Sequence, residues 1–93
     1  MKVLWTNAAI DHLVTTYEYI ALDAPLYARR MVDRLTARSQ QLSAFPQSGR
    51  VVPEFEREDI REVIERPYRI IYQITLDRIL VLAVVHGARL LTL

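Results

Sequence analysis

The sequence predicts a two-layer α+β domain in which a helical hairpin packs on a mainly antiparallel sheet. Three observations support this prediction. The first half of the chain has helical periodicity, the second half has strand-like segments, and the connections between segments are short. The 93 residues are 52% hydrophobic and 25% charged, which is typical of one globular domain spanning residues 1–93. The expected order is β-α-α-β-β-β.

A strand and a first helix are expected at the start of the chain. Residues 2–5 are short and apolar, and Thr6 or Asn7 offers a helix N-cap. From Ala9 onward, apolar residues recur at spacings of one, three and four, which places them on one broad helical face. These residues are Ala9, Ile10, Leu13, Val14, Tyr17, Ile20 and Ala21.

A second helix is expected over residues 25–44. Asp23 offers an N-cap, and Pro25 lies in the first turn, where proline costs no hydrogen bond. Because the connection is so short, the two helices must be antiparallel. The buried stripe of this helix is expected to contain Ala28, Met31, Val32, Leu35 and Leu42.

Three strands are expected in the second half of the chain. They cover residues 60–65, 68–75 and 79–85, and hairpin-length turns join them. The last of these segments is apolar on both faces, which indicates a central strand covered on both sides. In the middle segment one face is shared by Tyr68, Ile70, Tyr72 and Ile74.

Two local features lie outside these elements. Gly49 and Gly87 are the only glycines, and each is predicted to need backbone angles that other residues avoid. Apolar residues at the chain end are expected to dock on the core or to await a partner. They are Leu90, Leu91 and Leu93.

The composition excludes several classes of protein. Without cysteine there is no disulfide scaffold, thiolate zinc site or cysteine nucleophile. His12 and His86 are the only imidazoles and are far apart in sequence, so no metal or other cofactor is expected. No apolar run reaches the roughly 18 residues of a membrane span, and no signal peptide is evident, which favours the cytoplasm. The net charge of +1 is smaller than nucleic-acid-binding domains usually carry.

Arginines on the expected strands are the first candidate site. If Arg61 and Arg69 point to the same side of neighbouring strands, they form an electropositive patch on the sheet face away from the helices. Such a patch would clamp phosphates or stabilise charge in a transition state. The alternative is that these arginines form ion pairs on a solvated face. The acidic neighbours for such pairs are Asp59, Glu62 and Glu65.

A histidine near the chain end is the second candidate. His86 follows the expected central strand and precedes Gly87 and Arg89. A histidine beside an arginine can act as a general acid or base next to a phosphate clamp. The alternative is a histidine that ends a strand and bonds locally to the backbone.

An ordered set of short segments resembles the RelE/ParE superfamily of toxins from bacterial type II toxin–antitoxin systems. The similarity extends over nearly the whole chain, and the superfamily's order of strand, helices and strands agrees with the prediction above. The segments begin with Trp5-Thr6, Asp11-His12-Leu13 and Asp23-Ala24-Pro25. They continue with Pro46, Gly49-Arg50, Pro53-Glu54, Ile60-Arg61-Glu62-Val63, Tyr68-Arg69-Ile70-Ile71-Tyr72 and Val85-His86-Gly87-Ala88-Arg89.

The resemblance implies one of two activities on this fold. RelE-like members cut messenger RNA on the ribosome, and ParE-like members inhibit DNA gyrase. The basic residues of RelE-like members after the hairpin are often lysines, but here only Arg50 and Arg57 are available, and no Tyr or His follows Arg89. These departures favour a ParE-like gyrase inhibitor without catalytic residues. Its expected target-binding residues are Arg69, His86 and Arg89.

Two alternatives remain open. In a ribosome-dependent endoribonuclease, Arg61, Arg69 and Arg89 would hold the scissile phosphate of ribosome-bound mRNA, while His86 or Arg57 helps proton transfer. In the second alternative, the chain is an inert relative that only binds its antitoxin. In each case the resemblance implies a toxin–antitoxin hetero-oligomer. A disordered antitoxin segment would fold over the helical hairpin and the sheet edge.

Overall fold

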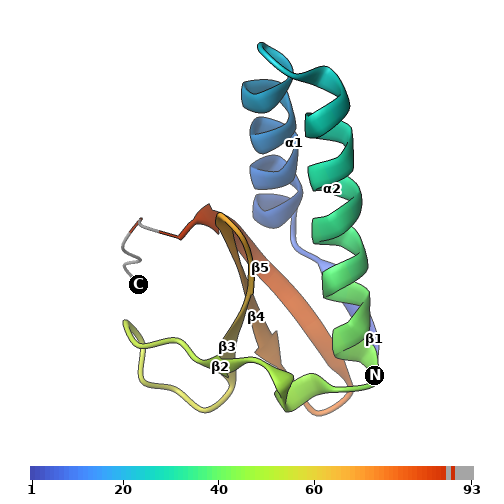
Figure 1. Ribbon diagram of the computed structural model, residues 1–93. Helices are drawn as coiled ribbons and strands as arrows, with labels where there is room; N and C mark the ends of the chain where they lie inside the picture. Colours follow the sequence, from blue (N-terminus) through green and yellow to red (C-terminus); the bar gives the residue numbers. More distant parts are fainter. Residues whose placement is uncertain (88, 90–93) are drawn as a thin grey trace.

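A helical hairpin packs on one face of a five-stranded sheet and projects beyond it in the computed structural model, which describes residues 1–87 and 89 (Figure 1). This arrangement confirms the predicted α+β class. The expectation for the apolar chain end lies outside the described residues. The elements are β1 (Lys2–Trp5), α1 (Asn7–Ala21), α2 (Pro25–Gln40), β2 (Arg50–Val51), β3 (Ile60–Glu65), β4 (Tyr68–Ile74) and β5 (Arg78–His86).

The strand order in the sheet is β1-β5-β4-β3-β2. β1 runs parallel to β5, and the other neighbours are antiparallel. β5 therefore lies between two strands, as its apolar sequence predicted. The two-residue strand β2 was not predicted, because so short a segment has no periodicity to read. It exists through its pairing with β3, in which Arg50 lies opposite Glu62.

Helix boundaries differ from the predictions in two places. α2 ends at Gln40 instead of residue 44, and the chain continues as a 3₁₀ turn over Gln41–Ser43. The prediction that Asp23 caps α2 is wrong, since Ala24 is the N-cap and makes no side-chain cap bond. The backbone amide of Asp23 instead bonds to the carbonyl of Ile20, so this residue belongs to the turn that closes α1.

Thr6 caps α1 and also fastens it to the sheet. Its Oγ1 accepts a hydrogen bond from the Ala9 amide at 3.1 Å, which satisfies one free donor of the first turn. The same hydroxyl donates to the carbonyl of Val81 on β5 at 3.0 Å. One side chain thus begins the helix and fixes its position over the central strand.

The core has two parts, one on each face of the sheet. The larger part packs Met31 and Leu35 of α2 against Ile70, Tyr72 and other residues of the predicted inner face of β4. The smaller part covers the opposite face and contains Val52, Ile60, Ile71 and Val85. The segment after β2 therefore covers the face that the helices leave open.

The glycine prediction is wrong in its mechanism, because neither Gly49 nor Gly87 has a positive φ. Gly49 is needed for space. A Cβ atom there would lie 2.5 Å from the Glu62 carbonyl oxygen and 2.6 Å from the Tyr72 hydroxyl. At Gly87 a Cβ atom would lie 3.1 Å from the Pro67 carbonyl oxygen, which is a tighter approach than most side chains tolerate.

Tyr72 occupies the space beside Gly49 and joins the helical and strand halves of the chain. Its ring is fully buried, its hydroxyl donates to the Pro46 carbonyl at 2.6 Å, and it accepts from the Gly49 amide at 3.0 Å. Burial raises the pKa of the Tyr72 phenol above its usual value. Both backbone partners belong to the connection between the hairpin and β2.

Replacing Tyr72 by phenylalanine (Tyr72→Phe) is expected to lower the free energy of unfolding by about 1–3 kcal/mol, because the buried Gly49 amide and the part-buried Pro46 carbonyl lose their partner. Urea denaturation at pH 7 measures this loss. Tyr19→Phe is the matched control, since Tyr19 is 69% exposed, and it is expected to change stability by less than about 0.5 kcal/mol. Equal effects of the two variants would contradict the role of the Tyr72 hydroxyl.

The raised pKa of Tyr72 also predicts a pH dependence. The folded state holds the phenolic proton more tightly than the unfolded state, whose pKa is about 10. The associated stability is fully present below pH ~10 and is lost as the pH rises through the folded value. As the pH rises above ~10, the free energy of unfolding measured by urea denaturation should therefore decrease more steeply for the unmodified chain than for Tyr72→Phe.

Candidate functional site

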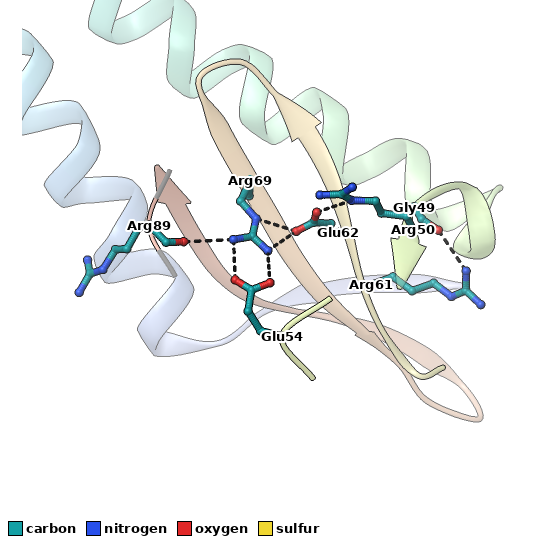
Figure 2. Close-up of polar contacts among 7 residues, drawn as sticks. All are labelled: Gly49, Arg50, Glu54, Arg61, Glu62, Arg69 and Arg89. Atoms are coloured by element: carbon teal, nitrogen blue, oxygen red, sulfur yellow. Dashed lines mark hydrogen bonds and ion pairs between the residues drawn. The ribbon is translucent and has the colours of Figure 1, made fainter. Parts of the chain in front are cut away.

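Arg69 lies at the centre of a network of ion pairs on the sheet face away from the helices. Its side chain is 7% exposed. Nη1 and Nη2 donate to the two carboxylate oxygens of Glu54 at 2.9 and 3.0 Å, and Nε donates to Glu62 at 2.6 Å (Figure 2). The hydrogen bonds to Glu54, and secondarily those to Glu62, raise the pKa of Arg69. The guanidinium is thus permanently charged and held by side chains of its own domain.

Glu62 also pairs with a second arginine, Arg50, and so brings it into this network. Its carboxylate is 0% exposed and also accepts from Arg50 Nε at 2.6 Å. A buried carboxylate is strongly unfavourable unless it is paired, and here two guanidiniums satisfy it. With Glu54 the network contains two positive and two negative charges, so its formal sum is zero.

The network also contacts the backbone of Arg89, which follows β5. Arg69 Nη1 donates to the backbone carbonyl of Arg89 at 3.1 Å. Figure 2 shows the Arg89 side chain pointing away from Arg69 and Glu54. Arg69 and Arg89 are therefore neighbours through a main-chain contact, and their guanidiniums do not form a common cluster.

The predicted patch of Arg61 and Arg69 on one face is wrong. Arg61 lies opposite Tyr72 in the β3–β4 ladder, and Arg69 lies opposite Ile64. Directly opposite residues share a face, and Tyr72 belongs to the helix-side core. Residues 61 and 64 are three positions apart on β3, so they point to opposite faces. The sheet therefore separates the two arginines.

Arg61 holds the connections on either side of β2. Its guanidinium donates to the Gly49 carbonyl at 3.1 Å and to the backbone and side chain of Glu58 at 3.1 and 3.0 Å. The ion-pair alternative thus describes both arginines better than the exposed patch does. Of the acidic neighbours considered, only Glu62 is a partner of either arginine, since Asp59 pairs with Arg57 and Glu65 with Arg34.

His86 and Arg89 lie together in a groove on the helix side of the sheet. The groove has a volume of about 430 Å³ and runs between α1 and the ends of β4 and β5. Because it contains both imidazoles of the chain, we call it the histidine groove. It is lined by His12, Thr15, Thr16, Tyr19, Tyr68, Val84, Val85, His86 and Arg89.

Two of the aromatic rings that line the histidine groove contact each other. His86 and Tyr68 make an edge-to-face contact with ring centroids 6.0 Å apart and planes at 79°. Partial burial raises the pKa of the Tyr68 phenol, and the nearby phenols of Tyr27 and Tyr19 raise it further. Tyr68 therefore stays protonated at neutral pH and can donate a hydrogen bond to a ligand.

His12 occupies the edge of β5 beyond the end of β1. β1 pairs with β5 only as far as Trp5 and Val81. Three residues further along β5, the Val84 amide donates to His12 Nδ1 at 3.2 Å. Because Nδ1 accepts this hydrogen bond, the ring carries its hydrogen on Nε2. The side chain thus takes the place that a strand neighbour would fill.

The sequence did not predict most of the residues that line the groove, or two of the four residues in the ion-pair network. The two histidines are far apart in the sequence, and no sequence signal connects His12 with His86. Only the crossing of α1 over β5 brings the two together. Glu54 lies in an irregular segment, so periodicity does not reveal its contact with Arg69.

Among residues 1–87 and 89, those that line the groove include no carboxylate. Over the same residues, no group of three or more His, Asp or Glu side chains converges to hold a metal ion. No helix in the described part of the chain is long and apolar enough to cross a membrane.

Arg69→Met is expected to lower the free energy of unfolding by about 3–5 kcal/mol, because it leaves the buried Glu62 carboxylate with one partner and Glu54 without Arg69. Arg57→Met is the matched control. Its ion pair with Asp59 is 50% exposed on the arginine side, so the expected loss is below about 1 kcal/mol. Chemical denaturation compares the two, and similar losses would contradict a stabilising role of the network.

Comparisons with known proteins identify the family. Residues 3–91 match the family described as "ParE toxin of type II toxin-antitoxin system, parDE". The chain is 33% identical over 89 residues to "Toxin RelE2" of Caulobacter vibrioides (strain ATCC 19089 / CIP 103742 / CB 15), and the match covers 96% of this chain and 98% of that protein.

Two solved structures share the fold. One, described as "Chromosomal ParDE TA system from P. aeruginosa", has a TM-score of 0.79 at 21% identity, over 92% of this chain and 95% of that chain. The other, described as "YoeB/ParE toxin from Agrobacterium tumefaciens", has a TM-score of 0.56 at 22% identity, over 92% and 98%. The sequence matches and the shared fold lead to one conclusion: this chain belongs to the ParE toxin family of type II toxin–antitoxin systems, within the RelE/ParE superfamily.

Proposed function

We propose that this chain is a toxin that inhibits DNA gyrase by binding to it and that a cognate antitoxin neutralises it. The observation that carries the proposal is the separation of the strand arginines. Arg61 and Arg69 lie on opposite faces of the sheet, and the Arg69 guanidinium is occupied by Glu54 and Glu62. Membership of the ParE family also supports gyrase inhibition over cleavage of RNA.

Cleavage of RNA would require a different arrangement. A phosphate clamp needs several cations that converge on one phosphate within hydrogen-bond reach. Here Arg61 is bonded to the Gly49 carbonyl and to Glu58, and Arg69 is 7% exposed. Only Arg89 and His86 of the expected catalytic set share a groove. The geometry therefore favours protein binding over the ribonuclease alternative.

His86 and Arg89 are the proposed contact residues for the target. Both are exposed, and both line the histidine groove beside Tyr68. Tyrosine and arginine are among the residue types enriched at the positions that contribute most to binding at protein interfaces. Arg69 supports this surface indirectly, because it holds the backbone of Arg89 in place. We propose that the protein acts in the cytoplasm, where gyrase works.

The antitoxin is the second proposed partner. The Pseudomonas aeruginosa structure is described as a ParDE toxin–antitoxin system, and the matched family carries the same designation. An antitoxin for this chain is expected to be encoded in the neighbouring reading frame.

A parallel assay with one protein preparation tests the choice of target. The purified chain is expected to block DNA supercoiling by gyrase and to leave ribosome-bound messenger RNA uncut. Gel analysis of plasmid topoisomers and primer extension on the message provide the two readouts. Cleavage of the message without an effect on supercoiling would overturn the proposal in favour of the ribonuclease.

Arg89→Ala tests the proposed contact surface. We expect at least a tenfold rise in the concentration needed for half-maximal inhibition of gyrase, which corresponds to about 1.4 kcal/mol of lost interaction. Arg78→Ala is the matched control, because Arg78 lies at the start of β5, far from Arg89 beyond its end, and pairs only with the adjacent Asp77 among the described ion pairs. Unchanged inhibition by Arg89→Ala would remove Arg89 from the target surface.

A further inference from the structure

We propose that His12 is a positioning residue for the proposed contact residues His86 and Arg89, and that it loses this role when its ring is protonated. In the neutral ring, Nδ1 accepts a hydrogen bond from the Val84 amide and holds the end of β5 to α1. The charged ring cannot accept that bond. The statement about target binding rests on the proposed function, whereas the contact between His12 and Val84 can be tested without a target.

The end of β5 has one strand neighbour instead of two. β1 pairs with β5 only as far as Trp5 and Val81, where the Thr6 amide and hydroxyl both donate to the Val81 carbonyl at 3.0 Å. On the other side, β4 pairs with β5 as far as Tyr68 and His86. The last residues of β5 therefore depend for their position on β4 and on the group that covers their open edge.

His12 covers this open edge from a helix that is itself anchored to the sheet. Its Nδ1 lies 3.2 Å from the Val84 nitrogen, and the residue is half-buried. The first turn of α1 is fixed by Thr6, whose hydroxyl accepts from the Ala9 amide at 3.1 Å, and His12 lies about one turn further on. Because α1 is anchored in this way, the bond to Val84 transmits the position of the helix to the end of β5.

Protonation of the ring removes the acceptor on which this contact depends. Histidine is the side chain that changes its charge between about pH 5 and 8, and the imidazolium carries a hydrogen on both nitrogens. An N–H group of the His12 ring would then face the N–H group of Val84, with no acceptor between them. The bond is therefore present at the upper end of this pH range and is lost as the pH falls.

The groups around His12 also disfavour a charged ring. Among the described residues that line the histidine groove none is acidic, and Asp11, which precedes His12 on α1, does not face it because adjacent helix residues point in different directions. The titratable and charged groups of the lining come from α1, β4, β5 and the segment after β5. They are Tyr19, Tyr68, His86 and Arg89. Arg89 is always charged, so a positive charge on His12 would be repelled by it.

The proposed contact residues lie directly beyond the strand end that His12 holds. His86 is two residues after Val84 and packs edge to face on Tyr68, with ring centroids 6.0 Å apart. The backbone of Arg89 is held from the other face of the sheet, by Arg69 at 3.1 Å. If the bond to Val84 is lost, this segment must be ordered again when the target binds, and that cost lowers the affinity. We therefore expect binding to weaken as the pH falls.

NMR of the purified chain tests the contact. The unmodified chain is compared with His12→Asn, whose Oδ1 can replace Nδ1 as an acceptor without changing its charge, and with His12→Phe, which has a ring but no acceptor. Histidine, asparagine and phenylalanine have similar helix propensities, so this property does not distinguish the variants. At pH 8 we expect the hydrogen-exchange protection of the Val84 amide to fall about tenfold in His12→Phe and to change less than about threefold in His12→Asn. Full protection in His12→Phe would overturn the contact.

The same amide tests the effect of charge. Between pH 8 and pH 5 the Val84 resonance of the unmodified chain is expected to shift with the charge of the His12 ring, and its protection factor is expected to fall. His12→Asn should lack both changes. His86→Asn is the matched control, because it removes the other imidazole and keeps the bond to Val84, so both changes should remain. A Val84 amide that responds to pH in His12→Asn but not in His86→Asn would assign the response to His86 and overturn the inference.

Binding to gyrase separates this inference from the proposed function. In titrations with gyrase, we expect the dissociation constant of the unmodified chain to rise about threefold or more from pH 8 to pH 6, and that of His12→Asn to rise clearly less. Both chains keep His86, so the difference between them belongs to His12. The same pH dependence in both would show that His12 does not position the contact residues. If neither chain binds gyrase while the Val84 amide follows the charge of His12, the proposed function is wrong and the contact stands.

Discussion

The buried carboxylate of Glu62 imposes the constraint on which much of this structure depends. It lies on a central part of the sheet with 0% of its side chain exposed, so it must be paired to remain charged. Arg69 and Arg50 supply that pairing from β4 and β2. Because Arg69 also binds Glu54 and the Arg89 carbonyl, the pairing of this one carboxylate also positions Glu54, in the loop after β2, and the backbone of Arg89.

The sequence was sufficient for the fold because the helices and strands have strong periodicity. The shared face of Tyr68, Ile70, Tyr72 and Ile74 is found as predicted, and so is the interior position of β5. The errors concern places where distant contacts decide local structure. β2 is a strand only because β3 lies beside it, and Gly49 is required by the approach of Tyr72 instead of by its own backbone angles.

The site was harder to predict than the fold, for a geometric reason. Alternation along a single strand assigns faces correctly, but the relation between Arg61 and Arg69 depends on the register of β3 against β4. That register places Arg61 opposite Tyr72 and thus on the helix side. His12 and His86 are 74 positions apart, and they meet only because α1 crosses β5. Neither relation leaves a signal in local composition.

Arg69 connects the ion-pair network on the outer face of the sheet with the backbone of Arg89, and arginine is suited to this position. A lysine at position 69 would provide one ammonium group, whereas the guanidinium has five N–H donors in a fixed plane. Those donors reach Glu54, Glu62 and the Arg89 carbonyl at the same time. The balanced charges on the outer face therefore fix the backbone of Arg89, while its side chain is directed to the histidine groove. A residue buried on one face of the sheet in this way positions the backbone of a residue whose side chain lines the groove on the other face.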